Sequence, residues 1–343
     1  MDTDHVISVI VPAYNCGPFI RDAVGSLLSQ TYPREKVEII VVDDGSTDDT
    51  AEILSEYRGQ ISYYCQENQG IAGARNRGIS MAHGELVTFL DADDIWYRER
   101  LRRVAEAFSV YPQAGMAYHP VAVVDRSGRL MYENFLKAFG YKDGASGIIT
   151  NEILSGRVFC GGSSFTFRRR LVERVHPIPP GIRRGVDYYL SSVVSVLAHA
   201  VFIPEILGGY RFHGGNATMM AGQGSRGEIA AINADFAYAR QRTLEALRSL
   251  RESEEAMVDT SIITRRQTKE TIFLRVLEGK RCEGIRLIPG LFRGDLKGRD
   301  WSLAVFTTFM ALLVPSSCYP VFVKAYGQLN RGRIIFSPRR RLR

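Results

Sequence analysis

Three short apolar runs most constrain the fold of this 343-residue chain. They cover residues 6–11, 37–42 and 86–90, and each contains a single polar residue. Strands of parallel sheets are covered by helices on both faces, so they read as nearly continuous apolar segments. The three runs therefore predict buried strands of a mainly parallel sheet.

Amphipathic segments separate these runs. Apolar residues recur every three or four positions from Phe19 to Gln30, and Pro33 then stops this helix. A short strand over residues 61–64 and a glycine-containing helix over residues 71–82 are expected before the third run. This alternation requires right-handed crossovers with helices on both faces of the sheet. The predicted class is α/β: a Rossmann-like, mixed but mainly parallel sheet with flanking helices and a helical C-terminal extension.

Polar turns follow all three predicted strands, at residues 12–15, 43–44 and 91–94. In open α/β sheets ligands bind beyond the carboxyl ends of the strands, so these turns should meet at one functional edge. A dinucleotide-binding loop is excluded, because Gly70, Gly73 and Gly78 miss the GxGxxG spacing. A P-loop is excluded as well, because no GK[ST] sequence occurs.

The third run ends in the acidic sequence DADD. Asp91 and Asp93 are two residues apart, so an extended backbone would place both carboxylates on one face, where they could share one Mg²⁺ or Mn²⁺ ion. Such an ion usually completes its coordination with water and phosphate oxygens, which predicts a phosphate-bearing substrate. The alternative is an acidic turn, or an N-cap of the helix that begins near Arg98.

Arg75, Asn76 and Arg77 lie in the helix that follows Gly70. An arginine that points at the functional edge could pair with Asp44 or with a substrate phosphate, because its guanidinium matches both partners. The alternative for these arginines is a solvated helix face.

Four motifs occur in order within the first 94 residues: VIVPAYN, VVDDGSTDDT, NQGIAGARNRG and TFLDADD. Together they closely resemble the family 2 glycosyltransferases, which have the GT-A fold. Members of this family transfer a sugar, with inversion, from a nucleotide-diphosphate sugar to an acceptor hydroxyl and use a divalent cation. The resemblance therefore implies a metal-dependent, inverting glycosyltransferase.

The resemblance also implies roles for individual residues. Asp44, with Asp43, would recognise the base, and Arg75 would lie near the nucleotide. Asp91 would touch the ribose or the metal, and Asp93 would ligate the metal, which is Mn²⁺ or Mg²⁺. The full implied set of nucleotide-sugar-binding residues is Pro12, Ala13, Tyr14, Asn15, Asp43, Asp44, Arg75, Asn76, Asp91 and Ala92.

The second half of the chain carries looser matches. Residues 161–164 resemble the family's small-residue turn before a return strand, where bulk would block the sugar. Residues 183–190 lie at the place of the family's Glu-Asp motif, but Val186 stands where many members carry Glu. Asp187 is left as the implied catalytic base. The alternative is an acid that only stabilises the N-terminus of a helix through the macrodipole.

His213 belongs to a segment that resembles the family's Tyr-Arg-x-His sequence. It could be a third metal ligand or a phosphate donor. A lone histidine is equally well explained as a structural residue.

The C-terminal part predicts helices over residues 228–251 and 265–278, followed by an uncharged stretch over residues 302–323. Pro315 and Pro320 cut this stretch and leave residues 303–314, which are too few to cross a bilayer. Residues 331–343 carry six arginines and no acid, which leaves a net charge of +1 for the rest of the chain. We expect an interfacial tail on anionic lipid, or alternatively a helix docked on the protein itself.

The expected organisation is a catalytic domain at residues 1–220, with a donor half at 1–110 and an acceptor half at 111–220. Helices packed on this domain would follow at 221–300, with the membrane-associating tail at 301–343. A mobile loop is expected over residues 140–147, on the acceptor side.

The N-terminal sequence MDTDH has no signal-peptide character, and the five cysteines are scattered. We therefore expect a cytoplasmic protein, peripherally bound to the cytoplasmic face of the membrane.

The acceptor expected from the resemblance is a polyprenyl-linked glycan in cell-surface polysaccharide synthesis. The alternative function is a catalytically silent nucleotide-sugar binder. Nucleic-acid binding is not expected, because the body has no basic aromatic groove, and the oligomeric state stays open.

Overall fold

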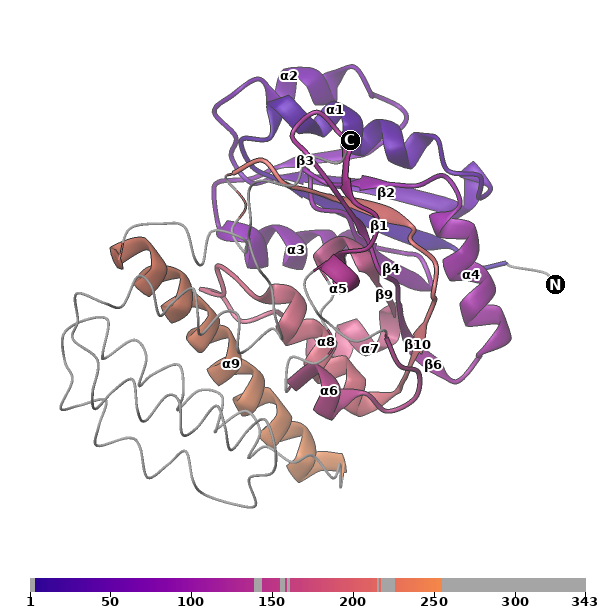
Figure 1. The fold of residues 1–343 in the computed structure, drawn as a ribbon, viewed down its shortest axis with the longest axis vertical. Coiled ribbons are helices and arrows are strands. Elements are labelled where there is room, and N and C mark those ends of the chain that lie inside the picture. Colours follow the sequence, from indigo (N-terminus) through magenta and orange to yellow (C-terminus); the bar gives the residue numbers. More distant parts are fainter. Residues whose placement is uncertain are drawn as a thin grey trace.

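The computed structural model describes residues 4–138, 144–154, 158, 161–214, 216 and 226–254. A seven-stranded sheet with the strand order β10-β6-β9-β4-β1-β2-β3 forms its centre (Figure 1). The strands are β1 (Ile7–Ala13), β2 (Val37–Asp43), β3 (Ser62–Cys65), β4 (Leu86–Phe89), β6 (Ala114–Tyr118), β9 (Phe165–Arg168) and β10 (His199–Phe202).

The sheet is mixed but mainly parallel, as predicted. Strand β1 pairs in parallel with β2 and β4, and β2 pairs in parallel with β3, whereas β9 runs antiparallel between β4 and β6. Strand β1 does not stop at Pro12 as expected but continues to Ala13. Beyond Ile10 only β2 is paired with β1, so the missing N–H of Pro12 removes no ladder bond on the β4 side.

Helices cover both faces of this sheet (Figure 1). The longer ones are α1 (Gly17–Leu28), α3 (Gly70–Met81), α4 (Arg100–Val110), α7 (Arg169–Val175), α8 (Val186–Leu197) and α9 (Arg226–Glu254). The shorter ones are α2 (Thr50–Ser55), α5 (Phe135–Ala138), α6 (Thr150–Leu154) and the 3-10 turns Arg34–Lys36 and Gly162–Ser164.

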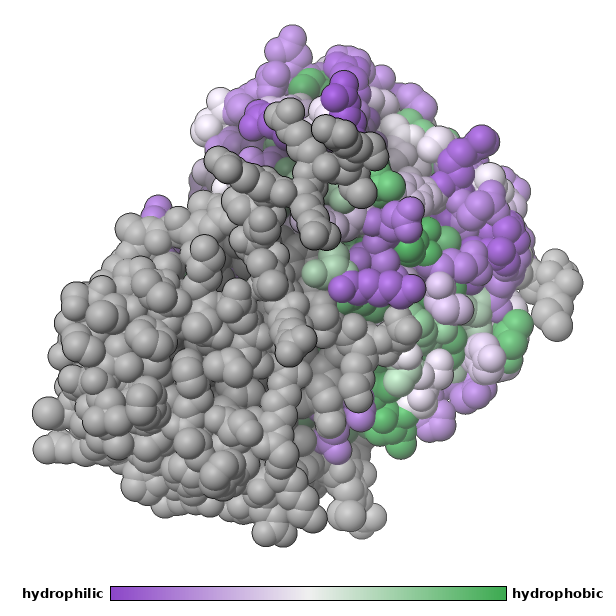
Figure 2. Space-filling view, in the orientation of Figure 1, coloured by the Kyte–Doolittle hydropathy of each residue, from purple (hydrophilic) through white to green (hydrophobic). Residues whose placement is uncertain are grey.

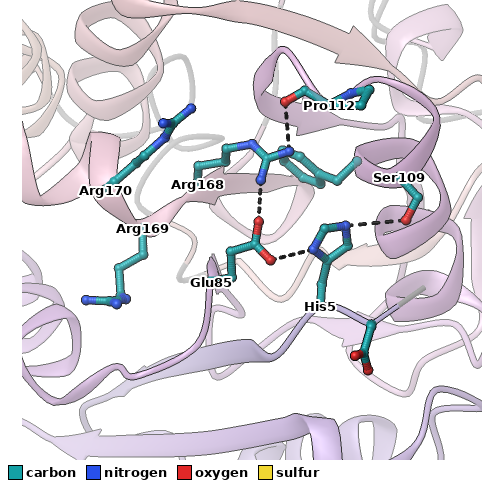
Figure 3. Close-up of a pocket in the computed structure, with 9 residues that line it drawn as sticks. His5, Glu85, Ser109, Pro112, Arg168, Arg169 and Arg170 are labelled. Carbon is teal, nitrogen blue, oxygen red and sulfur yellow. Dashed lines mark hydrogen bonds and ion pairs between the residues drawn. The ribbon is translucent and has the colours of Figure 1, made fainter. Parts of the chain in front are cut away.

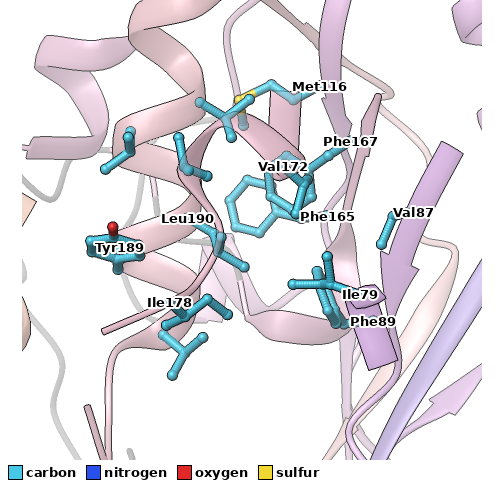
Figure 4. Packing of buried hydrophobic residues seen from close by; sticks show 14 of the residues in the cluster. Ile79, Val87, Phe89, Met116, Phe165, Phe167, Val172, Ile178, Tyr189 and Leu190 are labelled. Carbon is cyan, nitrogen blue, oxygen red and sulfur yellow. The ribbon is translucent and has the colours of Figure 1, made fainter. Parts of the chain in front are cut away.

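Side chains of β1 alternate between two cores. Val9 and Val11 join one core with α1 and α4, and Ile10 joins the other with α3, α7 and α8. Figure 4 shows part of the second core, where Leu190 of α8 and Val172 of α7 lie over the sheet. Burying one such side chain contributes about 1.5–3 kcal/mol, so the two cores hold the strand ends in fixed positions.

A second sheet of four short strands, with the order β5-β11-β7-β8, was not predicted. Its strands are β5 (Ile95–Trp96), β11 (Gly208–Arg211), β7 (Ala122–Val124) and β8 (Leu130–Tyr132). Runs of two to four residues carry too little periodicity to be recognised. This sheet matters for function because β5 directly follows the acidic turn and pairs antiparallel with β11.

Helix α9 confirms the helix expected over residues 228–251. Its Ala239, Leu244 and Leu247 are buried in the same core as Leu190 and Val193 of α8. The helix expected over residues 265–278 and the tail at 301–343 lie outside the described residues, as does most of the loop expected at 140–147.

Among the described residues, no helix combines the length and the apolar character needed to cross a membrane. The described surface in Figure 2 is mostly hydrophilic, with apolar residues scattered between polar ones.

Candidate active site

The acidic sequence after β4 forms a turn at the carboxyl edge of the sheet. The N–H of Asp94 donates to the carbonyl of Asp91 over 3.0 Å, so the backbone forms the acidic turn that was the alternative to an extended segment. The ladder ends at Phe89, and the chain must reverse here to enter β5. The side chains of Asp91 and Asp93 are nevertheless 28% and 31% exposed, which leaves both carboxylates accessible at this edge.

Arg75 joins two of the predicted site residues. Its guanidinium donates to Oδ1 of Asp91 over 2.7 Å and to Oδ1 of Asp187. The side chain is fully buried, so little water screens these two ion pairs. The sequence left open whether an arginine here pairs with Asp44 or with a substrate phosphate; in the structure Arg75 pairs with Asp91 and Asp187, because the fold brings α8 to it. Arg75 thus connects the acidic turn to the start of α8.

The surroundings of Gly162 explain why the turn before β9 requires a small residue. A β-carbon at this position would lie 2.5 Å from Nη2 of Arg75, 2.7 Å from Oδ1 of Asp187 and 2.9 Å from Oδ2 of Asp91. A side chain would therefore collide with the charged cluster itself. The sequence pattern pointed to the correct turn, and the contacts add a reason for its small size.

His213 follows β11 and lies against Asp93. Its Nε2 is 2.9 Å from Oδ2 of Asp93, and its ring centroid is 4.7 Å from that of Phe19. Strand β11 also holds the backbone of Asp93, because Nε of Arg211 donates to its carbonyl over 2.8 Å. The predicted metal residues Asp91, Asp93 and His213 are therefore gathered at one edge, with His213 next to Asp93.

Three polar residues that the sequence reading did not assign hold this turn. Oγ of Ser163 donates to Oδ2 of Asp94 over 2.6 Å and accepts the N–H of Asp91 over 3.1 Å. The N–H of Arg211 donates to Oδ1 of Asp94 over 2.9 Å. Burial, followed by the charges of Asp93 and Asp91, raises the pKa of Asp94 well above its ordinary value. Asp94 is the last residue of the motif TFLDADD, but its partners Ser163 and Arg211 are far away in sequence and gave no local signal.

The acidic turn has the donors that a hard divalent cation prefers. Burial raises the pKa of Asp91 to about 6; the charge of Arg75 opposes this shift, and the charges of Asp187 and Asp93 add to it. A cation beside these carboxylates would relieve the repulsion. Among the described residues, no group of three or more His, Cys, Asp or Glu side chains forms a complete metal site. Two carboxylates nevertheless fit Mg²⁺ or Mn²⁺, which also take water and substrate phosphates.

The paired acids at the end of β2, Asp43 and Asp44, are buried and hydrogen-bonded. Asp43 accepts bonds from the N–H of Ser46 at 2.8 Å and from the hydroxyl of Tyr63 at 2.9 Å. Asp44 accepts bonds from Nε2 of Gln66 at 2.7 Å and from the N–H of Gln69 at 2.9 Å. These bonds fix the loops at the predicted base site, and the base contact expected for the two acids stays a prediction.

The turn after β1 lies beside these acids. The carbonyl of Ala13, which follows Pro12, accepts the N–H of Asp44 over 2.8 Å, and Oδ1 of Asn15 accepts the N–H of Thr47 over 2.8 Å. Tyr14 is 52% exposed and free of the core. The segment predicted to line the base pocket therefore presents the exposed Tyr14 at the carboxyl edge of the sheet, and its contact with a base stays a prediction.

Two of the predicted nucleotide residues face other parts of the protein. The carboxamide of Asn76 donates to the carbonyl of Ile178 at 2.9 Å and accepts its N–H at 2.8 Å. Asn76 therefore fastens α3 to the segment before α8. Ala92 is 6% exposed within the acidic turn and joins the core of α1 and α4. The nucleotide contact predicted for either residue rests on the motif alone.

A separate pocket lies at the opposite edge of the sheet, where β1 and β4 begin (Figure 3). Its polar side chains are bonded to one another: Arg168 pairs with Glu85, which lies 2.6 Å from Nδ1 of His5. His5 also contacts the hydroxyl of Ser109 at 3.3 Å. This network joins the segments before β1 and β4 to β9 and α4.

Comparison with known proteins agrees with this geometry. A family model described as Glycosyl transferase family 2 matches residues 8–175. An uncharacterized glycosyltransferase of Nostoc sp. (strain PCC 7120 / SAG 25.82 / UTEX 2576) is 31% identical over 242 residues, which cover 68% of this chain and 73% of that protein.

Three solved structures share the fold at low sequence identity. TarS of S. aureus aligns with a TM-score of 0.53 and 17% identity over 94% of this chain, which spans only 54% of TarS. Residues 1–349 of TarS, in complex with UDP-GlcNAc, align with a TM-score of 0.54 and 18% identity over 94% of this chain and 90% of that one. The mannosyltransferase PcManGT from Pyrobaculum calidifontis, in complex with GDP-Man and Mn²⁺, aligns with a TM-score of 0.53 and 18% identity over 95% and 86% of the two chains.

These likenesses confirm the predicted GT-A fold. The family model and the extent of the match to the Nostoc relative show the family as well as the fold. This chain belongs to glycosyltransferase family 2.

Proposed function

We propose that this protein transfers a sugar from a nucleotide-diphosphate sugar to an acceptor hydroxyl, with inversion at the anomeric carbon. The observation that carries the proposal is the cluster of Asp91, Arg75 and Asp187 at the carboxyl edge of the sheet. It brings an acid from the donor half together with an acid from the acceptor half. Sugar transfer needs donor binding and proton removal from the acceptor at one place.

Asp91 and Asp93 would hold Mn²⁺ or Mg²⁺ together with the diphosphate of the donor. When bound, the cation stabilises the negative charge that develops on the departing diphosphate. The complexes of TarS with UDP-GlcNAc and of PcManGT with GDP-Man and Mn²⁺ support a nucleotide-sugar donor and a divalent cation for this chain. Arg75 is buried between two carboxylates, so we assign it to orienting them rather than to the phosphates.

Asp187 is the proposed general base. Arg75 engages its Oδ1, so we assign proton removal to Oδ2. The acceptor oxygen would attack the anomeric carbon on the face opposite the diphosphate. The bond from this carbon to the diphosphate oxygen would break, and the hydroxyl proton would pass to Asp187. A base placed in this way typically contributes about a 100- to 10,000-fold rate increase.

The acceptor that we propose is a lipid-linked glycan of a cell-surface polysaccharide, reached at the cytoplasmic face of the membrane. Support comes from the sequence of the tail, in which the apolar residues 303–314 are followed by six arginines at residues 331–343. Such a segment suits the surface of an anionic membrane.

A ligand panel tests the proposed function. Thermal unfolding is followed with UDP-, GDP- and dTDP-sugars, each with and without Mn²⁺, because a ligand that binds only the folded state raises the Tm. Release of nucleoside diphosphate from the donor that binds is then measured. Metal-dependent binding with turnover supports the transferase, and binding without turnover would favour the silent nucleotide-sugar binder. No binding to any donor would contradict both.

A further inference from the structure

Helix α9 touches the segment that leads to Asp187. Asp235 of α9 forms an ion pair with Arg184, and the hydroxyl of Tyr238 donates to the carbonyl of Pro180 over 3.0 Å. Both partners in this segment precede α8, whose second residue is Asp187. Helix α9, at the end of the described chain, therefore contacts the segment that directly precedes the proposed base.

The turn at Gly185 lies directly against α9. Its φ is +83°, a left-handed conformation that glycine adopts without strain. A β-carbon at Gly185 would lie 3.2 Å from Cβ of Ala239 and 3.2 Å from Cδ1 of Phe236. Because Gly185 is the N-cap of α8, the surface of α9 limits where the first turn of α8 can begin.

Helix α9 is anchored independently of these polar contacts. Ala239, Leu244 and Leu247 are buried in one core with α8. Substituting Asp235 should therefore leave the helix in place and release only the segment in front of it. The contact also lies beyond residues 8–175, so the region matched by the family model does not include it.

We propose that Asp235 and Tyr238 are positioning residues for Asp187, an inference that rests on the proposed role of Asp187 as the base. They act by holding residues 180–185 against α9. Oδ1 of Asp187 must stay on Arg75, next to Gly162, while its other oxygen meets the acceptor. A displacement of about 1 Å in such an arrangement can lower the rate about 100-fold.

Hydrogen exchange tests the structural part in the full-length protein. Asp235→Ala combined with Tyr238→Phe should speed exchange of the amides at residues 181–188 roughly two- to fivefold, the effect of losing a partly exposed ion pair and one hydrogen bond. Glu56→Ala is the matched control, because it also removes a carboxylate paired with an arginine, Arg21, but between α1 and the end of α2. Equal exchange of the amides at residues 181–188 in the double variant and the parent would overturn the proposal.

Kinetics test the positioning role. With the donor selected by the ligand panel, Asp235→Ala should lower kcat roughly tenfold while the donor Kd stays unchanged, and Asp235→Glu should restore most of kcat. Faster exchange with an unchanged kcat would overturn positioning. A parent protein without turnover would contradict the proposed function instead, and the exchange result would still decide whether α9 holds this segment.

Discussion

The guanidinium of Arg75 lies 2.5 Å from the position that a β-carbon of residue 162 would occupy. Glycine at this position therefore makes room for a buried arginine that pairs with two carboxylates. The donor-side acid and the acceptor-side acid meet only because no side chain stands between them.

Gly162→Ala should destabilise the protein and lower its activity. The added methyl group must displace the buried charged cluster, at a cost of about 1–3 kcal/mol. Denaturant unfolding measures the loss. Gly161→Ala is the control, because a β-carbon there meets no atom within 4 Å and φ is −75°. Equal stability of the two variants would contradict the steric role of Gly162.

Much of this arrangement could be predicted from the sequence, because its local signals are strong. The apolar runs gave the strands β1, β2 and β4, and the polar turns gave the functional edge. The partners of Arg75 could not be predicted, since Asp187 lies 112 residues away and α8 had to be placed first.

The second sheet also depends on contacts between residues that are distant in sequence. Strand β11 is only four residues long, so no pattern reveals that it lies next to β5. Yet this pairing brings Arg211 to Asp94 and His213 to Asp93. Residues that hold a site through tertiary contacts are recognised from sequence only when a family motif includes them.

Asp93→Ala should remove the metal dependence of donor binding. A divalent ion held by few protein oxygens loses most of its affinity when one carboxylate is deleted. The shift in Tm with donor is measured with and without Mn²⁺. Asp125→Ala, which removes a half-buried carboxylate from the turn between β7 and β8, serves as the control. Unchanged Mn²⁺ dependence in the Asp93 variant would contradict the metal assignment.

Asp187→Asn should retain donor affinity and lower kcat by roughly 100- to 10,000-fold, because an amide cannot accept the acceptor's proton. The fold should persist, since the amide oxygen can still accept a bond from Arg75 and Asp91 keeps its own ion pair. Donor affinity and turnover are measured on the same preparation. Turnover at the parental rate would place the base on another residue.

The C-terminal tail should bind anionic vesicles. Apolar burial by residues 303–314 is combined with roughly 1 kcal/mol for each arginine near the surface, and salt weakens only the second contribution. Co-sedimentation should therefore be stronger with anionic than with neutral vesicles and should fall in high salt. Serine at all six arginines of residues 331–343 should remove the salt-sensitive part and leave donor binding intact. Failure of the parent to bind anionic vesicles at low salt would contradict the proposed membrane contact and the lipid-linked acceptor.

His119 should make folding stability depend on pH. Burial, followed by the charge of Arg100, lowers the pKa of His119 to about 3, although its hydrogen bond to the carbonyl of Pro120 opposes this shift. In an unfolded chain the pKa of histidine is about 6.5. Between these two values the unfolded chain binds a proton that the folded chain does not. The stabilising contribution is therefore complete above pH 6.5 and is lost as the pH falls toward 3.

His119→Gln should remove this dependence while its amide oxygen still accepts the bond that Nε of Arg100 donates to Nε2 of His119. The free energy of unfolding of the parent should then fall more steeply than that of the variant, by up to about 1.4 kcal/mol per pH unit between pH 6 and pH 4. Denaturant unfolding at several pH values measures both slopes. His199→Gln, at an exposed histidine, controls for the loss of an imidazole. Parallel curves for the parent and the His119 variant would mean that His119 takes up its proton equally in both states, which contradicts its burial beside Arg100.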